Sequence, residues 1–253
     1  MTTPTQNLIG KTAVITGGTT GIGFETAKHY IAAGARVIIT GQNQERLDAA
    51  VETLGPSAIG VNANVTDLTA LNHLAAEVES HFGKLDILFA NAGSGVFAPI
   101  ELVDEAAYDK QFDINVKGVF FTVQKLLPVL SEGASVILTA SAVHEKGVAT
   151  GSLYFATKAA VRSFARSLAV ELAPKGIRVN TLSPGIVRTH FAANTNVSED
   201  DFEGFIDMVK SQAPLGREGT PADMANAALF LASDASSYMT AADLVVDGGW
   251  MNV

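Results

Sequence analysis

Short runs of β-branched and aliphatic residues alternate with longer amphipathic segments along the whole chain. The longer segments carry helix-stop signals, since Gly34 and Gly83 stand where two of them end. Thr66 or Asp67 is placed to cap a helix that begins near Leu68. Alternation of this kind indicates an α/β fold with a parallel, doubly wound sheet of about seven strands and helices on both faces. The predicted strands are Thr12–Thr16, Arg36–Thr40, Ala58–Asn62, Asp86–Ala90, Ser135–Thr139, Arg178–Leu182 and Leu244–Val246.

The length and composition fit one domain. Of the 253 residues, 47% are hydrophobic, which is enough for a substantial core. No internal repeat, low-complexity tract or long Pro/Gly/Ser linker divides the sequence, so we expect residues 1–253 to form a single domain. The least regular part covers residues 189–214, and we interpret it as a mobile substrate flap over a site.

Charge and cysteine content exclude several classes of partner. The formal net charge of −9 argues against nucleic acid, which requires a clustered basic face. The absence of cysteine excludes disulfides, thiolate zinc sites and cysteine nucleophiles. The segment Met1–Lys11 is polar, and no uninterrupted apolar run approaches about 18 residues, so we expect no membrane partner and a cytoplasmic protein.

A glycine-rich turn, Thr-Gly-Gly-Thr-Thr-Gly-Ile-Gly, follows the first predicted strand and leads into a helix. Glycines let the backbone approach a pyrophosphate, which then binds at the positive end of the helix. Ligands of a doubly wound sheet bind beyond the carboxyl ends of the strands, near the reversal of strand order. Although the spacing differs from Gly-x-Gly-x-x-Gly, this position predicts a phosphate cradle at residues 16–23.

The residues after the second strand indicate which dinucleotide binds. A carboxylate there would bond to both ribose hydroxyls of NAD and repel the 2′-phosphate of NADP. Gly41, Gln42 and Asn43 stand at this place, so neither a carboxylate nor an arginine is present. Arg46 or Lys11 could reach a 2′-phosphate. We therefore favour NADP(H) and keep NAD(H) as the alternative.

Tyr154 and Lys158 are four residues apart, which on a helix places the phenol and the ammonium on one face. A free tyrosine titrates near pH ~10, and an adjacent cation lowers that pKa toward the range of general acid or base catalysis. Such pairs also occur by chance on helices whose tyrosine is packed and whose amine is solvated. Two further strand ends favour the catalytic interpretation, since Asn91 is placed to brace the sheet and Ser141 follows the fifth strand.

In their order and spacing, these motifs resemble those of the classical short-chain dehydrogenase/reductases. The resemblance extends over nearly the whole chain, as far as Asp247-Gly248-Gly249. It implies a Rossmann-like sheet, a nicotinamide cofactor, a small-molecule ketone or secondary alcohol as substrate, and a homotetramer. The catalytic set that it implies is Asn115, Ser141, Tyr154 and Lys158, and the implied cofactor contacts are Gly17, Thr19, Gly21, Ile22, Gly23, Gly41, Gln42, Asn64, Val65, Asn91, Ala92, Gly93, Tyr154, Lys158, Pro184, Gly185, Ile186 and Thr189.

The resemblance also implies a role for each catalytic residue. Tyr154 exchanges a proton with the substrate oxygen, and Ser141 hydrogen-bonds that oxygen where charge develops. Lys158 lowers the pKa of Tyr154 and holds the nicotinamide ribose. Asn115 anchors a water that links Lys158 to solvent, whereas without the resemblance it would be interpreted as a helix-interior residue bonded to backbone.

Two positions depart from the family pattern. Gln42 stands where many NADP-preferring relatives have a basic residue, and Asn64 stands where an adenine-contacting Asp is frequent. Cofactor preference is therefore the expectation that most needs a test.

The surroundings of the predicted site are mostly apolar, so we expect a small or medium ketone or secondary alcohol. His144 either steers a polar substituent or is a solvated loop residue. The five histidines lack metal-ligand spacing, so we predict no catalytic metal. The candidate pocket residues, for most of which a structural role is equally open, are Ser94, Val96, Phe97, Val143, His144, Leu153, His190 and Phe191.

Four other functions compete with this interpretation. A serine hydrolase would need a Gly-x-Ser-x-Gly turn, which is absent. A non-catalytic dinucleotide sensor would be favoured by loss of catalytic side chains, but these are intact. Among enzymes, enoyl reductases space Tyr and Lys more widely. A 3-oxoacyl thioester reductase is the closest alternative, although it should need basic residues to meet an acidic carrier.

Overall fold

The predicted strands form one parallel sheet in the computed structural model, which describes residues 7–189, 195 and 197–253. The seven strands lie in the order β3-β2-β1-β4-β5-β6-β7, which confirms the doubly wound sheet. The order reverses at β1 and β4, so a crevice for a ligand is expected where these two strands end. The strands are β1 (Thr12–Ile15), β2 (Arg36–Gly41), β3 (Ala58–Asn62), β4 (Leu85–Ala90), β5 (Leu130–Thr139), β6 (Arg178–Pro184) and β7 (Asp243–Val246).

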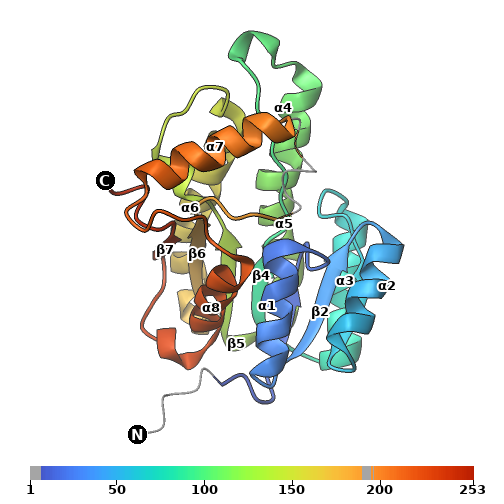
Figure 1. Ribbon diagram of the computed structural model, residues 1–253. Coiled ribbons are helices and arrows are strands. Elements are labelled where there is room, and N and C mark those ends of the chain that lie inside the picture. The colour runs from blue at the N-terminus through green and yellow to red at the C-terminus, as the bar shows by residue number, and fades with distance from the viewer. Residues whose placement is uncertain (1–6, 190–194, 196) are drawn as a thin grey trace, which may run out of the picture.

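Helices cover both faces of the sheet (Figure 1). Helices α1, α2 and α8 share one buried cluster, to which Tyr30 and Met224 belong. Helices α3, α5 and α6 share a second cluster on the other face, with Leu74 and Val123. Helix α7 lies across the carboxyl end of the sheet. The helices are α1 (Gly21–Ala32), α2 (Gln44–Leu54), α3 (Leu68–Phe82), α4 (Glu105–Phe112), α5 (Gly118–Leu126), α6 (Ser152–Leu172), α7 (Glu199–Gln212) and α8 (Pro221–Ala232).

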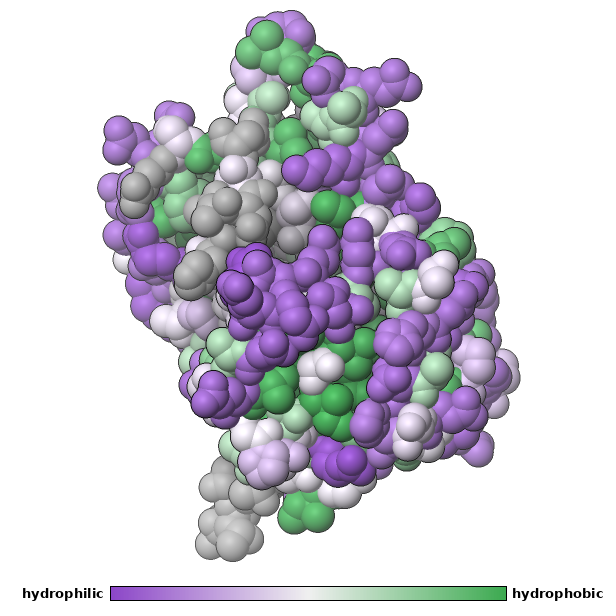
Figure 2. Space-filling model, turned by 90° about the vertical axis from the view of Figure 1, so that its right-hand side faces the viewer, coloured by the Kyte–Doolittle hydropathy of each residue, from purple (hydrophilic) through white to green (hydrophobic). Residues whose placement is uncertain are grey.

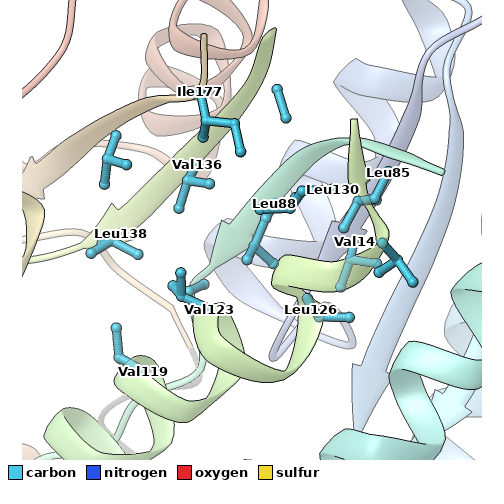
Figure 3. Packing of buried hydrophobic residues seen from close by; sticks show 14 of the residues in the cluster. Val14, Leu85, Leu88, Val119, Val123, Leu126, Leu130, Val136, Leu138 and Ile177 are labelled. Carbon is cyan, nitrogen blue, oxygen red and sulfur yellow. The ribbon is translucent and has the colours of Figure 1, made fainter. Parts of the chain in front are cut away.

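The side chains of each strand alternate between the two clusters. In β1, Val14 belongs to the cluster beneath α5, whereas Ile15 belongs to the cluster beneath α1. Figure 3 shows Leu88 of β4 and Val136 of β5 on the side of the sheet that α5 covers with Val123. Because both faces are buried, the strands read as nearly continuous apolar runs, which made them recognisable in the sequence.

Most strand ends lie within one or two residues of the prediction, and the start of β5 differs most. Strand β5 begins at Leu130 instead of Ser135, because Leu130 pairs with Leu85 before an irregularity shifts the register. The helical segment between β4 and β5 is divided into α4 and α5 by one turn of π-helix, η2 (Asp113–Lys117). Such a turn inserts extra backbone into a helix and is frequent at functional sites.

The segment 189–214 is largely helical where the structure describes it, since α7 occupies residues 199–212. Ser198 caps α7 by accepting a hydrogen bond of 3.1 Å from the N–H of Asp201. Of the flap predicted for residues 189–214, residues 190–194 and 196, which include His190 and Phe191, lie outside the described residues.

Polar residues predominate on the side of the molecule shown in Figure 2, which carries α2 and α3. Helix α2 explains this, because its buried side chains are Leu47, Ala50 and Leu54 and its charged residues lie on the opposite face. Among the described helices, none is both long and apolar enough to cross a membrane.

Candidate active site

A cavity of about 900 Å³ lies at the carboxyl ends of the strands, beside α7. It extends from the glycine-rich turn after β1, past the ends of β2 and β4, to the start of α6. This is the edge of the sheet at which the sequence predicts a ligand. The predicted residues that line the cavity are Gly17, Thr19, Gly21, Ile22, Gly41, Gln42, Val65, Asn91, Ala92, Gly93, Ser94, Phe97, Ser141, Val143, Tyr154, Lys158, Pro184, Gly185, Ile186 and Thr189.

The glycine-rich turn forms a cradle at the amino end of α1. Gly17 has a φ of 64°, in the left-handed region that favours glycine. Gly23 does not line the cavity, but a Cβ there would lie 2.4 Å from the Gly17 carbonyl oxygen, so the turn packs on the helix only with glycine. The N-cap residue Thr20 makes no side-chain hydrogen bond to the first turn. The uncapped helix end therefore fits the pyrophosphate of a dinucleotide.

Asn91 braces the cradle against the strand ends. Its Nδ2 donates to the carbonyl oxygens of Thr16 and Gly17 at 3.1 and 3.3 Å. Its Oδ1 accepts from the Thr139 hydroxyl over 3.4 Å. The Thr16 hydroxyl in turn accepts from the backbone N–H groups of Asn91 and Ala92, each at 3.0 Å. These bonds join β1, β4 and β5 at the reversal of strand order.

Of the two cations that the sequence offers for a 2′-phosphate, Arg46 lines the cavity and Lys11 does not. Arg46 lines the cavity next to the end of β2. Lys11 precedes β1 at the opposite edge of the sheet, where its Nζ lies 4.0 Å from Asp86 Oδ1. The hydroxyl of Thr40, at the end of β2, is buried in the same wall and has no partner within the described residues. Polar groups are thus available there for a ribose or its phosphate.

Asn64, which the sequence predicts as a cofactor contact, is not among the residues that line the cavity. Its Oδ1 accepts hydrogen bonds from the N–H of Thr66 at 3.0 Å and from Gln42 Nε2 at 3.3 Å. These bonds shape the turn before α3, and the neighbouring Val65 lines the cavity instead.

Three polar side chains converge on the cavity wall from different elements. Helix α6 carries Tyr154 and Lys158, and the Lys158 Nζ lies 5.5 Å from the Tyr154 ring centroid. Lys158 donates a hydrogen bond of 2.9 Å to the Thr139 carbonyl oxygen at the end of β5. Ser141, at the N-cap of the short helix η4 (Ala142–Glu145), is hydrogen-bonded to the side chain of Tyr154. Its Oγ also lies 3.4 Å from the Pro184 carbonyl oxygen.

Burial controls the ionisation of the Tyr154 and Lys158 pair. It raises the pKa of Tyr154 to about 12, and the hydrogen bond with Ser141 offsets only part of this effect. It lowers the pKa of Lys158 to about 8. In the protein chain, the pKa of Tyr154 is therefore raised, not lowered as the sequence predicts, because desolvation of the phenolate dominates. Tyr154 is consequently protonated at neutral pH and able to donate a proton.

Asn115 is buried at the centre of the π-helical turn η2. Its Oδ1 accepts from the Ser94 N–H, and its Nδ2 donates to the Ser94 carbonyl oxygen, both at 2.9 Å. The same Nδ2 lies 3.2 Å from the Thr157 hydroxyl of α6. Gln111 of α4 also holds this loop, since its side chain bonds to Ser94 and to the N–H of Val96. Asn115 thus matches the backbone-bonded interpretation, and its water-anchoring role stays a prediction.

Three candidate pocket residues, Val96, Leu153 and His144, do not line the cavity. Two more, His190 and Phe191, lie outside the described residues. His144 is neither a cavity residue nor a solvated one, because the η4 helix directs its side chain, which is 4% exposed, toward β7. There its Nε2 lies 3.3 Å from Asp243 Oδ2.

Aromatic side chains that the sequence analysis did not select line the substrate end of the cavity, namely Phe155, Phe202, Phe205 and Trp250. Trp250 is buried, and its Nε1 donates a hydrogen bond of 2.9 Å to Gln212 Oε1. Its ring lies 6.2 Å from that of Phe205. These contacts attach α7 to the turn that follows β7. No local sequence signal connects them, because they join distant parts of the chain.

A dinucleotide cradle at the reversal of a doubly wound sheet, with a buried tyrosine and lysine beside it, defines a nicotinamide-dependent oxidoreductase. Comparison with known proteins gives the same class. A family model described as enoyl-(acyl carrier protein) reductase matches residues 17–251. The oxidoreductase asL5 of Sarocladium schorii is 45% identical over 246 residues, which are 96% of this chain and 97% of that protein.

The similarity extends to other relatives and to solved structures. A 3alpha-hydroxysteroid dehydrogenase of Mediterraneibacter gnavus is 40% identical over 95% of this chain and 97% of its own length. The crystal structure of 3-ketoacyl-(acyl-carrier-protein) reductase from Brucella melitensis, complexed with NADH, has a TM-score of 0.89 and 32% identity over 97% of this chain and 100% of that chain. The chain therefore belongs to the short-chain dehydrogenase/reductase family and is an NAD(P)-dependent oxidoreductase.

Proposed function

We propose that this oxidoreductase is a carbonyl reductase, or in reverse an alcohol dehydrogenase, that uses NADP(H) and acts on a small-to-medium, mostly apolar ketone or secondary alcohol. One observation carries the proposal: the hydroxyls of Tyr154 and Ser141 and the amine of Lys158 converge in the cavity that also contains the dinucleotide cradle.

The chemistry follows from the protonation states and positions of these groups. A bound reduced nicotinamide supplies the hydride. Tyr154, protonated at neutral pH, donates its phenolic proton to the carbonyl oxygen as negative charge develops there. Ser141 donates a hydrogen bond to the same oxygen, and the Lys158 ammonium stabilises the phenolate that remains. Since oxidation needs the phenolate as base, the raised pKa of Tyr154 favours reduction near neutral pH.

A preference for NADP(H) is supported by the charges at the adenosine end. Arg46 lines the cavity there, and the neighbouring Gly41, Gln42 and Asn43 bring no carboxylate. A guanidinium binds a phosphate through charge-assisted hydrogen bonds, whereas a free 2′-hydroxyl would gain little from it. NAD(H) remains the alternative coenzyme.

The aromatic lining supports an apolar substrate. Phe97, Phe155, Phe205 and Trp250 surround the end of the cavity next to Tyr154. A polyol would need a hydrogen-bond partner for each buried hydroxyl group, which these four rings do not offer, because the Trp250 N–H is bonded to Gln212. The similarity to a 3alpha-hydroxysteroid dehydrogenase agrees with an alcohol carried on an apolar frame.

A 3-oxoacyl thioester reductase is the second candidate, because the reductase from Brucella melitensis has nearly the same fold. The net charge of −9 opposes docking of an acidic carrier protein. A free acyl thioester without a carrier is not opposed in this way.

We further propose that residues 189–214 act as a substrate flap and that the enzyme is a homotetramer, as the family resemblance implies. The flap is anchored by Arg188, whose Nη2 lies 2.9 Å from Glu203 Oε2 of α7 and whose Nε lies 3.2 Å from Glu218 Oε1.

The direct test is consumption of NADPH and of NADH against a panel that contains aliphatic and aromatic ketones, a 3-ketosteroid, a 3-oxoacyl thioester and a ketose. The proposal predicts turnover of apolar ketones with a higher kcat/KM for NADPH. Turnover of only the thioester would favour the second candidate. Tight coenzyme binding without turnover of any panel member would contradict the proposed substrate class and favour a sensor.

A further inference from the structure

His144 links Ser141 to the edge of the sheet. Its side chain is 4% exposed, and its Nδ1 lies 2.5 Å from the Ser141 carbonyl oxygen. Because a carbonyl oxygen can only accept, Nδ1 is the donor in this bond. The other ring nitrogen, Nε2, lies 3.3 Å from Asp243 Oδ2 at the start of β7. The Nδ1–H thus holds the Ser141 carbonyl, and Nε2 also donates to Asp243 when the ring carries both protons.

Asp243 is itself fixed by β6. Thr181 and Ser183 lie on one face of β6, and both hydroxyls donate to Asp243 Oδ1 over 2.6 Å. Thr181 is also the register partner of Asp243 in the β6–β7 pair. One carboxylate oxygen therefore binds the strand, and the other is directed at His144. Glu145 also approaches His144 Nε2, at 3.5 Å, but its side chain is 70% exposed.

Apart from its hydrogen bond with the Tyr154 side chain, the bonds of the Ser141 hydroxyl are long. Its Oγ is 3.4 Å both from the N–H of Val143 and from the carbonyl oxygen of Pro184. Contacts of this length hold a hydroxyl weakly. The Ser141 carbonyl, by contrast, accepts from both the backbone N–H and the ring of His144, at 3.1 and 2.5 Å. The orientation of the Ser141 hydroxyl therefore depends on how its backbone is held as well as on its bond with Tyr154.

We propose that His144 is a positioning residue for the reaction: through its bond to the Ser141 carbonyl, and anchored by Asp243, it orients the Ser141 hydroxyl toward Tyr154 and the substrate oxygen. The inference rests on the proposed function, because it assumes that Ser141 acts on that oxygen. His144 itself touches neither substrate nor cofactor, since it does not line the cavity.

Two amide substitutions separate the two ends of the imidazole. In His144→Asn the amide nitrogen occupies the place of Nδ1 and keeps the bond to Ser141, whereas His144→Gln reaches toward Asp243 and loses that bond. With the best ketone of the panel, we expect kcat to fall by about 10- to 100-fold in His144→Gln, as for a small misplacement of a reacting group. We expect a smaller, several-fold loss in His144→Asn, which keeps the bond to Ser141 but loses the contact with Asp243, with the Kd for NADPH unchanged in both. Rates are normalised to NADPH-binding sites, so that unfolded protein does not contribute.

A double-mutant cycle with Ser141→Ala distinguishes positioning from general destabilisation. If His144 acts through Ser141, the double variant Ser141→Ala/His144→Gln is no slower than Ser141→Ala. The inference would be overturned if the fold-losses of the two single variants multiplied in the double variant, or if His144→Gln kept the wild-type kcat. Full activity of Ser141→Ala would instead overturn the proposed function.

Two further variants complete the test. Glu145→Gln is the matched control and should keep the wild-type kcat, because its exposed carboxylate contributes little. Should His144→Gln fold poorly, Ser183→Ala removes one donor to Asp243 and should lower kcat several-fold at unchanged Kd for NADPH. An unchanged kcat in that variant would overturn the anchoring role of Asp243.

Discussion

The Nζ atom of Lys158 lies 5.5 Å from the centre of the Tyr154 ring, and its hydrogen bond to the Thr139 carbonyl oxygen spans 2.9 Å. The side chain is 4% exposed, and burial lowers its pKa to about 8. No carboxylate within the described residues forms a salt bridge with it. A buried charge without a counterion destabilises a fold, and the role proposed for Lys158 at Tyr154 and the coenzyme gives a reason for that cost.

We expect Lys158→Met to stabilise the protein at pH 7 while removing most activity. Below pH 8 the folded and unfolded chains are both protonated at Lys158, and the folded state carries the full desolvation cost. As pH rises from about 8 toward the ordinary value of 10.5, the unfolded chain holds more protons and the wild type gains stability. Desolvation of the Lys158 ammonium costs on the order of 3 kcal/mol, and the variant no longer carries this cost. The variant also loses the hydrogen bond to the Thr139 carbonyl, which lowers its gain in stability by about 1 kcal/mol.

Thermal unfolding without coenzyme at pH 7 and pH 10 checks this prediction. The melting temperature of Lys158→Met should exceed that of the wild type by roughly 4–8 °C at pH 7, and the difference should shrink at pH 10. A variant that is less stable than the wild type at pH 7 would show that the ammonium is well solvated or paired.

Glycine substitutions in two helices should act in opposite directions. A Cβ at Gly23 would lie 2.4 Å from the Gly17 carbonyl oxygen and 2.7 Å from Asn91 Nδ2. We therefore expect Gly23→Ala to cost roughly 1–3 kcal/mol and to weaken NADPH binding at least tenfold, because the cradle must shift. Gly204 in α7 has no atom within 4 Å of its Cβ position, so Gly204→Ala should stabilise by roughly 0.5–1 kcal/mol. Urea unfolding and coenzyme titration measure both effects, and equal behaviour of the two variants would contradict the cradle geometry.

The role of Arg46 in coenzyme choice is tested by Arg46→Gln. Loss of a charge-assisted contact to the 2′-phosphate is worth about 1.5–3 kcal/mol, so the ratio of kcat/KM for NADPH to that for NADH should fall by at least about tenfold. Lys11→Gln is the matched control, since Lys11 directly precedes β1 and so lies at the amino ends of the strands, away from the cavity. If Arg46→Gln leaves the ratio unchanged, the 2′-phosphate binds elsewhere or the enzyme prefers NADH.

Most of the fold follows from the sequence because strands buried on both faces are short apolar runs and glycines mark the ends of helices. The exceptions depend on contacts that a local pattern does not contain. The early start of β5 rests on pairing of Leu130 with Leu85, and the π turn around Asn115 is stabilised by bonds to Ser94 and Thr157.

The candidate site shows the same division. Residues placed directly at strand ends, such as Ser141, line the cavity as predicted, whereas His144 was misplaced because one turn of η4 directs its side chain away. Trp250 joins the cavity from the far end of the chain. A Cβ at Gly41 would lie 2.5 Å from Thr19 Cγ2, so a carboxylate introduced there requires movement of Thr19, which the sequence does not reveal.

Tyr154→Phe tests the central claim most directly. The substitution removes the phenolic proton donor and leaves the ring in its contact with Phe97, whose centroid lies 5.2 Å away. We expect the wild-type Kd for NADPH, a melting temperature within a few degrees of the wild type, and a loss of kcat of about 10²- to 10⁴-fold with the best ketone of the panel. A variant that binds NADPH normally and retains a near-normal kcat would contradict the assignment of Tyr154 as the general acid.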